Sequence, residues 1–152
     1  MVMFKKQNKI AKQQFVDKAR EYLGVLVVHA GRNKLGIDCV GLFVCTGRDL
    51  GMLDKDYTDV DYSPYVVPER LIESIEKFGK KKAEFETFDL ADIVVFTVGK
   101  WPHHIGLISK LDDNGDVYFI HTDLTAQKVV ESRLDRSWSD RIHSLYSIKG
   151  LS

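Results

Sequence analysis

Apolar residues recur at helical spacing in three parts of the first half of the chain. We therefore predict helices over the ranges 10–23, 39–50 and 68–78. A glycine follows each range and is suited to end a helix: Gly24, Gly51 and Gly79. Pro68 fits the first position of the third helix, where its missing N–H costs nothing.

In the second half of the chain the period changes from helical to strand-like. The predicted strands cover residues 92–98, 104–110, 117–122, 128–132 and 142–148. Residues 112–116 read Asp-Asp-Asn-Gly-Asp, which is a strong hairpin signal. The lysines at 80–82 are interpreted as a solvated turn. Helices followed by an antiparallel sheet predict one α+β domain over residues 1–152.

Composition and charge exclude several classes of protein. The 152 residues carry 22 Lys+Arg and 22 Asp+Glu, so a net charge of zero gives no electrostatic argument for binding nucleic acid. No apolar run approaches the roughly 20 residues of a membrane span. The first nine residues lack the apolar stretch of a secretory signal, so we expect cytoplasmic synthesis.

Cys39 falls in the first turn of the second predicted helix, directly after Asp38. Amide groups and the dipole at a helix N-terminus favour a thiolate, which is the nucleophilic form of cysteine. The backbone N–H of Cys39 is also placed to donate to an oxyanion. Cys45 lies mid-helix, about 9 Å farther along the axis and beyond disulfide reach. A lone cysteine is more often a small buried hydrophobe, and we assign that part to Cys45.

Two histidines lie on neighbouring predicted strands. His104 begins one strand and His121 ends the next. In a hairpin these two positions lie close together, so we predict that the imidazoles meet. A cysteine followed by such a pair suggests thiol catalysis, with His104 as general base and His121 orienting it. His103 points to the opposite face of the strand.

Two glycines are predicted to allow close packing at these positions. Gly41 keeps the first turn of the cysteine helix small, so that a neighbouring strand can approach. Gly106 is predicted to leave room for a helix beside the His104 strand.

A metal site would compete for the same residue types. The side chains that could bind a metal are His103, His104, His121, Cys39 and Asp92. They form no Cys-x-x-Cys or His-Glu-x-x-His pair. We therefore expect no metal site.

These motifs resemble the NlpC-type papain-like cysteine peptidases of bacterial cell walls, and most of all the short, leaderless members found among phage tail proteins. The resemblance runs over residues 11–148, and it is sharpest at 37–42, 91–96, 104–107 and 120–121. Residues 128–134 are similar to the end of the phage-type domain. The resemblance implies a papain-like core of N-terminal helices on a small antiparallel sheet. It assigns Cys39 as nucleophile, His104 as base and His121 as the third, orienting residue, with no cofactor.

The same resemblance implies a substrate and a setting. The reaction would be hydrolysis of amide bonds in peptidoglycan stem peptides, usually after γ-linked D-glutamate. The implied partners are peptidoglycan peptides and phage tail proteins. A phage protein would act from the virion tail or be delivered to the cell wall, whereas a bacterial one would act on recycled wall peptides in the cytoplasm.

Two positions depart from the family pattern. The loop before the cysteine helix commonly reads Pro-Tyr-x-x-Gly-Gly, but here Val27 replaces the tyrosine, which is thought to line the oxyanion hole. Valine cannot donate a hydrogen bond, and losing one oxyanion donor costs roughly 10²–10³ in turnover. His29 is a candidate replacement, and we assign His29 and Asp38 to substrate or oxyanion binding. Ala91 replaces the family's usual glycine.

Two other functions stay open at this stage. The first is a non-catalytic domain that binds wall peptides or builds a phage tail, which the Val27 departure favours. The second is a papain-like acyltransferase or amidase that acts on a different acyl substrate.

Overall fold

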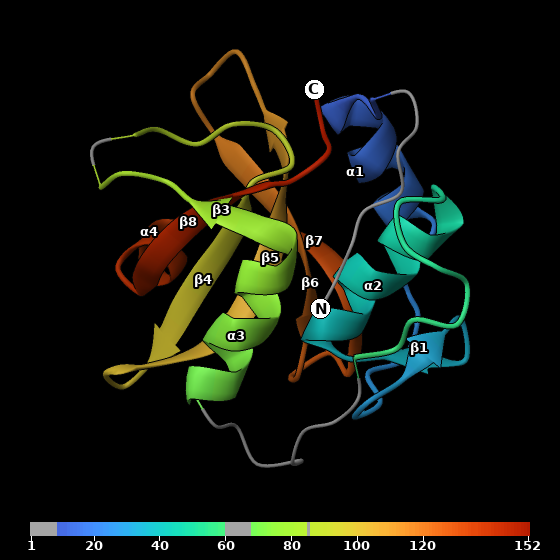
Figure 1. Ribbon diagram of the computed structural model, residues 1–152. Helices are drawn as coiled ribbons and strands as arrows, with labels where there is room; N and C mark the ends of the chain where they lie inside the picture. Colours follow the sequence, from blue (N-terminus) through green and yellow to red (C-terminus); the bar gives the residue numbers. More distant parts are fainter. Residues whose placement is uncertain (1–8, 60–67, 85) are drawn as a thin grey trace.

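A six-stranded antiparallel sheet forms the centre of the protein (Figure 1). The computed structural model describes residues 9–59, 68–84 and 86–152. The strand order is β3-β8-β4-β5-β6-β7. The bounds are β3 Gly79–Lys81, β4 Ile93–Val98, β5 Trp101–Leu111, β6 Val117–Asp123, β7 Lys128–Arg133 and β8 Ile142–Ile148. Four consecutive strands, β4 to β7, thus form a meander, and β8 returns to pair with β4 and β3.

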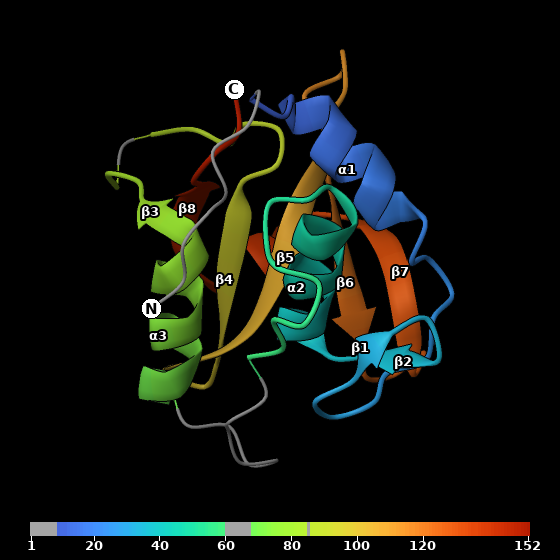
Figure 2. The same cartoon turned by 45° about the vertical axis from the view of Figure 1, so that its right-hand side comes forward.

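Three helices cover one face of the sheet (Figures 1 and 2). They are α1 Lys12–Arg20, α2 Cys39–Asp49 and α3 Pro68–Phe78. The short helix α4, Arg136–Ser139, lies over the other face, where Trp138 packs against buried residues of the sheet. A two-stranded hairpin, β1 Arg32–Asn33 and β2 Gly36–Ile37, precedes α2.

Alternation along the strands divides the buried residues into two clusters. In β4, Ile93 and Val95 belong to the larger cluster beneath the three long helices. Val94 and Phe96 belong to the smaller cluster beside α4. Successive strand residues point to opposite faces, so this division separates the two faces of the sheet.

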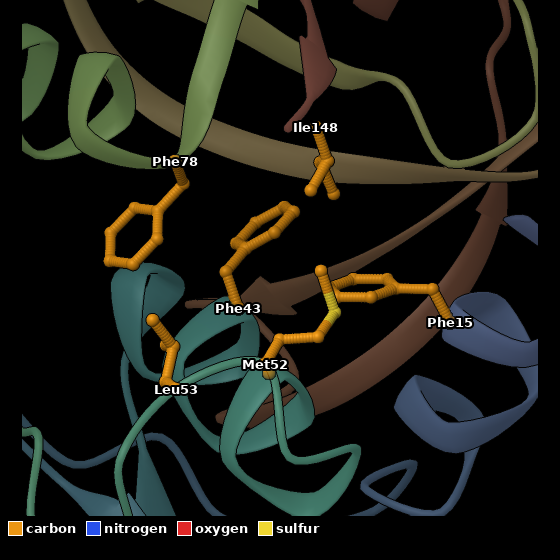
Figure 3. Close-up of a pocket in the computed structure, with 7 residues that line it drawn as sticks. Phe15, Phe43, Met52, Leu53, Phe78 and Ile148 are labelled. Atoms are coloured by element: carbon orange, nitrogen blue, oxygen red, sulfur yellow. The ribbon is translucent and has the colours of Figure 1, made fainter. Parts of the chain in front are cut away.

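The helices meet over an apolar pocket (Figure 3). Its lining comes from α1, α2, α3, β8 and the loop after α2: Phe15, Phe43, Gly47, Met52, Leu53, Phe78 and Ile148. The pocket has no polar side chain in its lining, so it belongs to the packing of the helices on the sheet.

Most of the predicted elements are confirmed. α2 and α3 end next to Gly51 and Gly79 as predicted, and the five predicted strands are present. α1 is shorter than predicted and stops at Arg20, because residues 21–24 form turns. The α+β class is confirmed as well. The leaderless N-terminus inferred from sequence falls mostly in residues 1–8, outside the described part of the chain.

The interpretation of residues 80–82 as a solvated turn is wrong. Residues 79–81 form β3, whose partner is β8. Lys82 Nζ then bonds Asp92 Oδ2 at 2.6 Å, and that carboxylate side chain is 1% exposed. Lysines are poor strand formers that often protect edge strands, so only the pairing with β8 reveals this element.

Two features are absent from the described part of the chain. Within the described ranges, no helix has both the length and the apolar character needed to cross a membrane. In the same part of the chain, no three His, Cys, Asp or Glu side chains gather in a way that could hold a metal ion.

Candidate active site

Cys39 is the first residue of α2, and Asp38 is its N-cap. The Gly41 amide donates to Asp38 Oδ1 at 2.8 Å, which satisfies one of the free N–H groups of the first turn. A Cβ on Gly41 would lie 2.5 Å from the Gly31 carbonyl oxygen. The predicted need for a small residue here is therefore confirmed, and the neighbour that approaches is the loop that enters the β1–β2 hairpin.

Asp38 also anchors the loop before the helix. Arg32 Nη1 donates to Asp38 Oδ1 at 2.8 Å, and the Ala30 amide donates to Asp38 Oδ2 at 2.8 Å. Arg32 is 8% exposed, and it donates further to the carbonyl oxygens of Thr58 and Asp59. A carboxylate only accepts hydrogen bonds, so these contacts give Asp38 a structural role and no means of donating to an oxyanion.

Burial, the larger cause, and the nearby Asp38 carboxylate together raise the pKa of the Cys39 thiol to about 12. The Ile105 and Val40 amides and the Arg32 guanidinium oppose this shift but do not overcome it. The helix N-terminus therefore does not yield the acidic thiol that the sequence suggested, because its capping carboxylate and the surrounding protein both disfavour the thiolate.

The contact between Cys39 and Ile105 depends on how β5 and β6 separate. Their ladder ends with the pair Leu107–Ile120. Beyond that pair β6 no longer engages the Ile105 amide, which instead stabilises negative charge on the Cys39 sulfur. The thiol therefore lies beside the residue that directly follows His104.

The two predicted histidines are in contact. His104 Nε2 and His121 Nδ1 are 2.9 Å apart, as a hydrogen bond requires. His121 Nε2 lies 3.1 Å from the hydroxyl oxygen of Ser132 on β7. The predicted meeting of the imidazoles at the open end of the hairpin is thus present, and it continues into a third polar group.

Aromatic side chains enclose this pair. Trp138 packs against His121 and His104 with ring centroids 5.0 and 5.9 Å apart, and Phe119 stacks on His121 at 4.3 Å. Burial lowers the pKa of His104 to about 3 and that of His121 to about 4. Both imidazoles are therefore neutral near pH 7, and each carries a single ring proton.

The prediction for Gly106 is wrong in its detail. A Cβ there would lie 2.7 Å from the Phe119 ring and 3.5 Å from His121 Cβ. The missing side chain therefore makes room for two residues of β6 and not for a helix. Strand pairing decides which neighbour a glycine serves, and the sequence alone does not give the register.

The three candidate catalytic residues differ in their contacts. His104 and His121 are hydrogen-bonded to each other, and Cys39 lies beside Ile105. Within the described ranges, no hydrogen bond joins the Cys39 sulfur to His104. The bond to His121 uses Nε2 of His104, which leaves Nδ1 as the nitrogen that could exchange a proton with the thiol.

The remaining candidate residues lie around this centre. His29 is exposed in the turn before Ala30, and Val27 forms a bridge to Ile37. Ala91 has φ +65°, in the left-handed region that favours glycine. The family that the sequence resembles usually has a glycine at this position. Ala91 keeps the same left-handed backbone conformation, which is less favourable for a residue that has a Cβ.

Sequence reasoning missed Arg32, Ser132 and Trp138. Arg32 lies in a turn-rich loop, where nothing marks it as buried. Ser132 reaches His121 only through the register of β6 with β7, and Trp138 only through the return of α4 to the sheet. A hairpin register for residues 117–133 would have indicated Ser132, because it lies diagonally across the ladder from His121.

Comparison with known proteins identifies the fold. No family model matches the sequence, and no curated protein matches it. Solved structures do match. One is the NlpC/p60 domain of the peptidoglycan hydrolase SagA, 17% identical, with a TM-score of 0.59 over 91% of this chain and 99% of that one. The chain has an NlpC/p60 fold.

Two further structures support the same NlpC/p60 assignment. An NlpC/p60 family protein from Bacillus cereus is 15% identical, with a TM-score of 0.62 over 90% of this chain and 40% of that one. NlpC1 from Trichomonas vaginalis is 16% identical, with a TM-score of 0.61 over 93% of this chain and 46% of that one. The present chain therefore spans less than half of each of these two proteins.

Proposed function

We propose that this protein is a cysteine amidohydrolase that cleaves amide bonds in peptidoglycan stem peptides through an acyl-enzyme. The observation that carries the proposal is the hydrogen-bonded pair His104–His121, together with Cys39 at the start of α2 and beside Ile105, the residue that follows His104. The NlpC/p60 fold supports the substrate class, because one structure with this fold is that of a peptidoglycan hydrolase domain.

In the proposed reaction Cys39 and His104 both start neutral. The Cys39 sulfur attacks the amide carbonyl carbon while its proton passes to His104 Nδ1. Collapse of the tetrahedral intermediate breaks the C–N bond, and His104 returns the proton to the leaving amine. Water then attacks the thioester with His104 as base, which releases the carboxylate and restores the thiol. His121 keeps the imidazole of His104 in place through Nε2.

The oxyanion of the intermediate needs hydrogen-bond donors. The backbone N–H of Cys39, at the N-terminus of α2, is the first donor that we propose. Val27 supplies none, and the exposed His29 two residues farther is the second candidate. With one donor fewer than the family pattern, turnover would be about 10²–10³ below that of an enzyme that has the tyrosine.

The finer parts of the proposal concern the bond and the setting. We infer that the protein cleaves the bond after γ-linked D-glutamate. We also infer that it is associated with a phage tail, has tail proteins as partners and acts at the cell wall. Support comes from the sequence resemblance, including residues 128–134, which form β7 and the residue after it.

Incubation with purified muropeptides, followed by mass spectrometry of the products, tests the proposed function. We expect a shortened stem peptide that ends in D-glutamate, and the released amine fragment. Cleavage at another amide would support the proposed class of enzyme but contradict the proposed scissile bond. Intact muropeptides after long incubation would overturn the proposal.

A second candidate is a domain that binds wall peptides without cleaving them. The absent donor at Val27 and the thiol pKa of about 12 favour it. This alternative predicts saturable binding of muropeptides in calorimetry together with no turnover. It would act on the same cell-wall peptides, so only product analysis separates the two.

A further inference from the structure

The hydrogen-bond chain in the site does not end at the third catalytic candidate. It runs from His104 Nε2 to His121 Nδ1, and from His121 Nε2 to Ser132 Oγ, over distances of 2.9 and 3.1 Å. His121 is 1% exposed, so its ring nitrogens have to find partners inside the protein. Ser132 supplies the partner for Nε2.

Two arrangements of protons are possible in this chain. Both imidazoles are neutral, so a single proton lies between the facing nitrogens of His104 and His121. If His104 Nε2 carries it, His104 Nδ1 has a lone pair and His121 is protonated at Nε2. If His121 Nδ1 carries it, His104 is protonated at Nδ1 and cannot accept a proton there.

Only the first arrangement is compatible with a basic His104. When His104 gains a second proton, both of its nitrogens become donors. His121 Nδ1 then has to accept, so the proton of His121 has to lie on Nε2 and needs an acceptor of its own. The Ser132 hydroxyl oxygen can accept it, while its hydrogen turns to the solvent that the half-exposed side chain reaches.

We propose that Ser132 is a positioning residue that holds His121 in its Nε2-protonated form and thereby leaves Nδ1 of His104 free to take a proton. The expected effect of Ser132 on turnover rests on the proposed function, whereas its expected effect on the protonation of the two rings does not. Trp138 supports the inference by packing against both imidazoles, which limits the movement of the two rings.

The test measures the protonation of each ring nitrogen by long-range ¹H–¹⁵N correlation spectroscopy near pH 7. We expect both His104 and His121 to carry their proton on Nε2 in the wild type. In Ser132→Ala the Nε2 proton of His121 loses its acceptor, so both protons are expected on Nδ1. Ser132→Thr keeps the hydroxyl on a residue suited to a strand, and it should retain the wild-type pattern.

Ser144→Ala is the matched control, because Ser144 also bonds a histidine. Its hydroxyl oxygen lies 2.9 Å from His143 Nδ1, on β8 and outside the site. That variant should leave both site rings unchanged. Turnover of muropeptides should fall about tenfold or more in Ser132→Ala, within the roughly 10⁴-fold loss known for a wrong tautomer, and it should be restored in Ser132→Thr.

The outcomes separate the two claims. A wild type with His121 protonated at Nδ1, or rings that do not change in Ser132→Ala, overturns the role of Ser132 even where muropeptides are cleaved. A loss of turnover without a change of tautomer also overturns it, because a structural defect would give the same loss. The expected tautomers in a protein that cleaves nothing would support the inference and reject the proposed function. If Ser132→Ala does not fold, the wild-type pattern and Ser132→Thr decide.

Discussion

The chemical surroundings of Cys39 differ from those of the His104–His121 pair. Cys39 has charged neighbours, the Asp38 carboxylate and the Arg32 guanidinium, which are joined at 2.8 Å. The histidines have aromatic neighbours, and burial is the main cause of their lowered pKa values. On the thiol side the capping carboxylate adds to burial, so charge and desolvation act together there.

The comparison shows that burial favours the uncharged form of the thiol and of both imidazoles, and that a neighbouring carboxylate, Asp38, adds to this effect only at the thiol. A thiol with a pKa of about 12 and imidazoles with pKa values of about 3 and 4 give a neutral pair at rest. A thiolate–imidazolium pair is therefore not the resting state of this protein. Proton transfer would accompany attack on the substrate, when the carbonyl group comes to lie against the thiol.

Alkylation of Cys39 is the strongest test of whether its thiol is neutral at rest. Near pH 7 the thiolate fraction at a pKa of about 12 is about a thousandfold below that of an ordinary thiol with a pKa of 9.0. We expect iodoacetamide to modify Cys39 about 10³-fold more slowly in the folded protein than in urea, read by peptide mass spectrometry. The unfolded protein is the control, since it has the same thiol without burial. Rapid modification of the folded protein below about pH 8.5 would show a primed thiolate and contradict the neutral pair.

Asp38→Ala removes the carboxylate from the surroundings of Cys39. It removes the helix cap and leaves the buried Arg32 without its carboxylate, so we expect a loss of about 3–5 kcal/mol in the free energy of unfolding. Urea denaturation followed by circular dichroism measures the loss. Glu73→Ala is the matched control, because it breaks the exposed ion pair of Glu73 with Arg70 and should cost less than about 1 kcal/mol. Equal losses in both variants would contradict a structural role for Asp38.

Lowering the pH tests whether burial keeps His104 and His121 neutral. The folded-state pKa values of His104 and His121 lie below the unfolded value of about 6.5, so the unfolded chain binds protons first as the pH falls. Stability should therefore be retained above about pH 6.5 and be lost steadily toward about pH 4, by about 2–4 kcal/mol between pH 7 and pH 5.

Urea titrations at a series of pH values measure this slope. The loss should shrink in His121→Gln, which removes one of the two buried imidazoles. His143→Gln is the control, because His143 is an exposed histidine outside the site. A slope that is the same in wild type and His121→Gln would show that other groups cause the acid sensitivity.

The parts of the site that the sequence predicts are those set by local signals. Asp38 before an apolar-periodic segment locates the start of α2 and so the place of Cys39. The Asp-rich turn fixes the hairpin, in which Asp112 Oδ1 accepts from the Asn114 and Asp116 amides at 3.0 and 2.9 Å. From that hairpin follows the contact of His104 with His121.

The parts that the sequence does not predict depend on contacts between distant segments. The raised pKa of Cys39 follows from burial in the folded protein and from the Asp38 carboxylate, and no local pattern reveals the burial. β3 exists because β8 pairs with it, although its lysines favour a turn. Ser132 and Trp138 enter the site only through strand register and the return of α4.

The most direct test of the central claim is the release of peptide fragments from purified peptidoglycan by wild type, Cys39→Ala and Cys45→Ala. Cys45 is the matched control, because it is a buried cysteine of the same helix, away from the histidine pair. The account predicts release by wild type and Cys45→Ala, and none by a folded Cys39→Ala. Undiminished release by Cys39→Ala would contradict catalysis by this thiol.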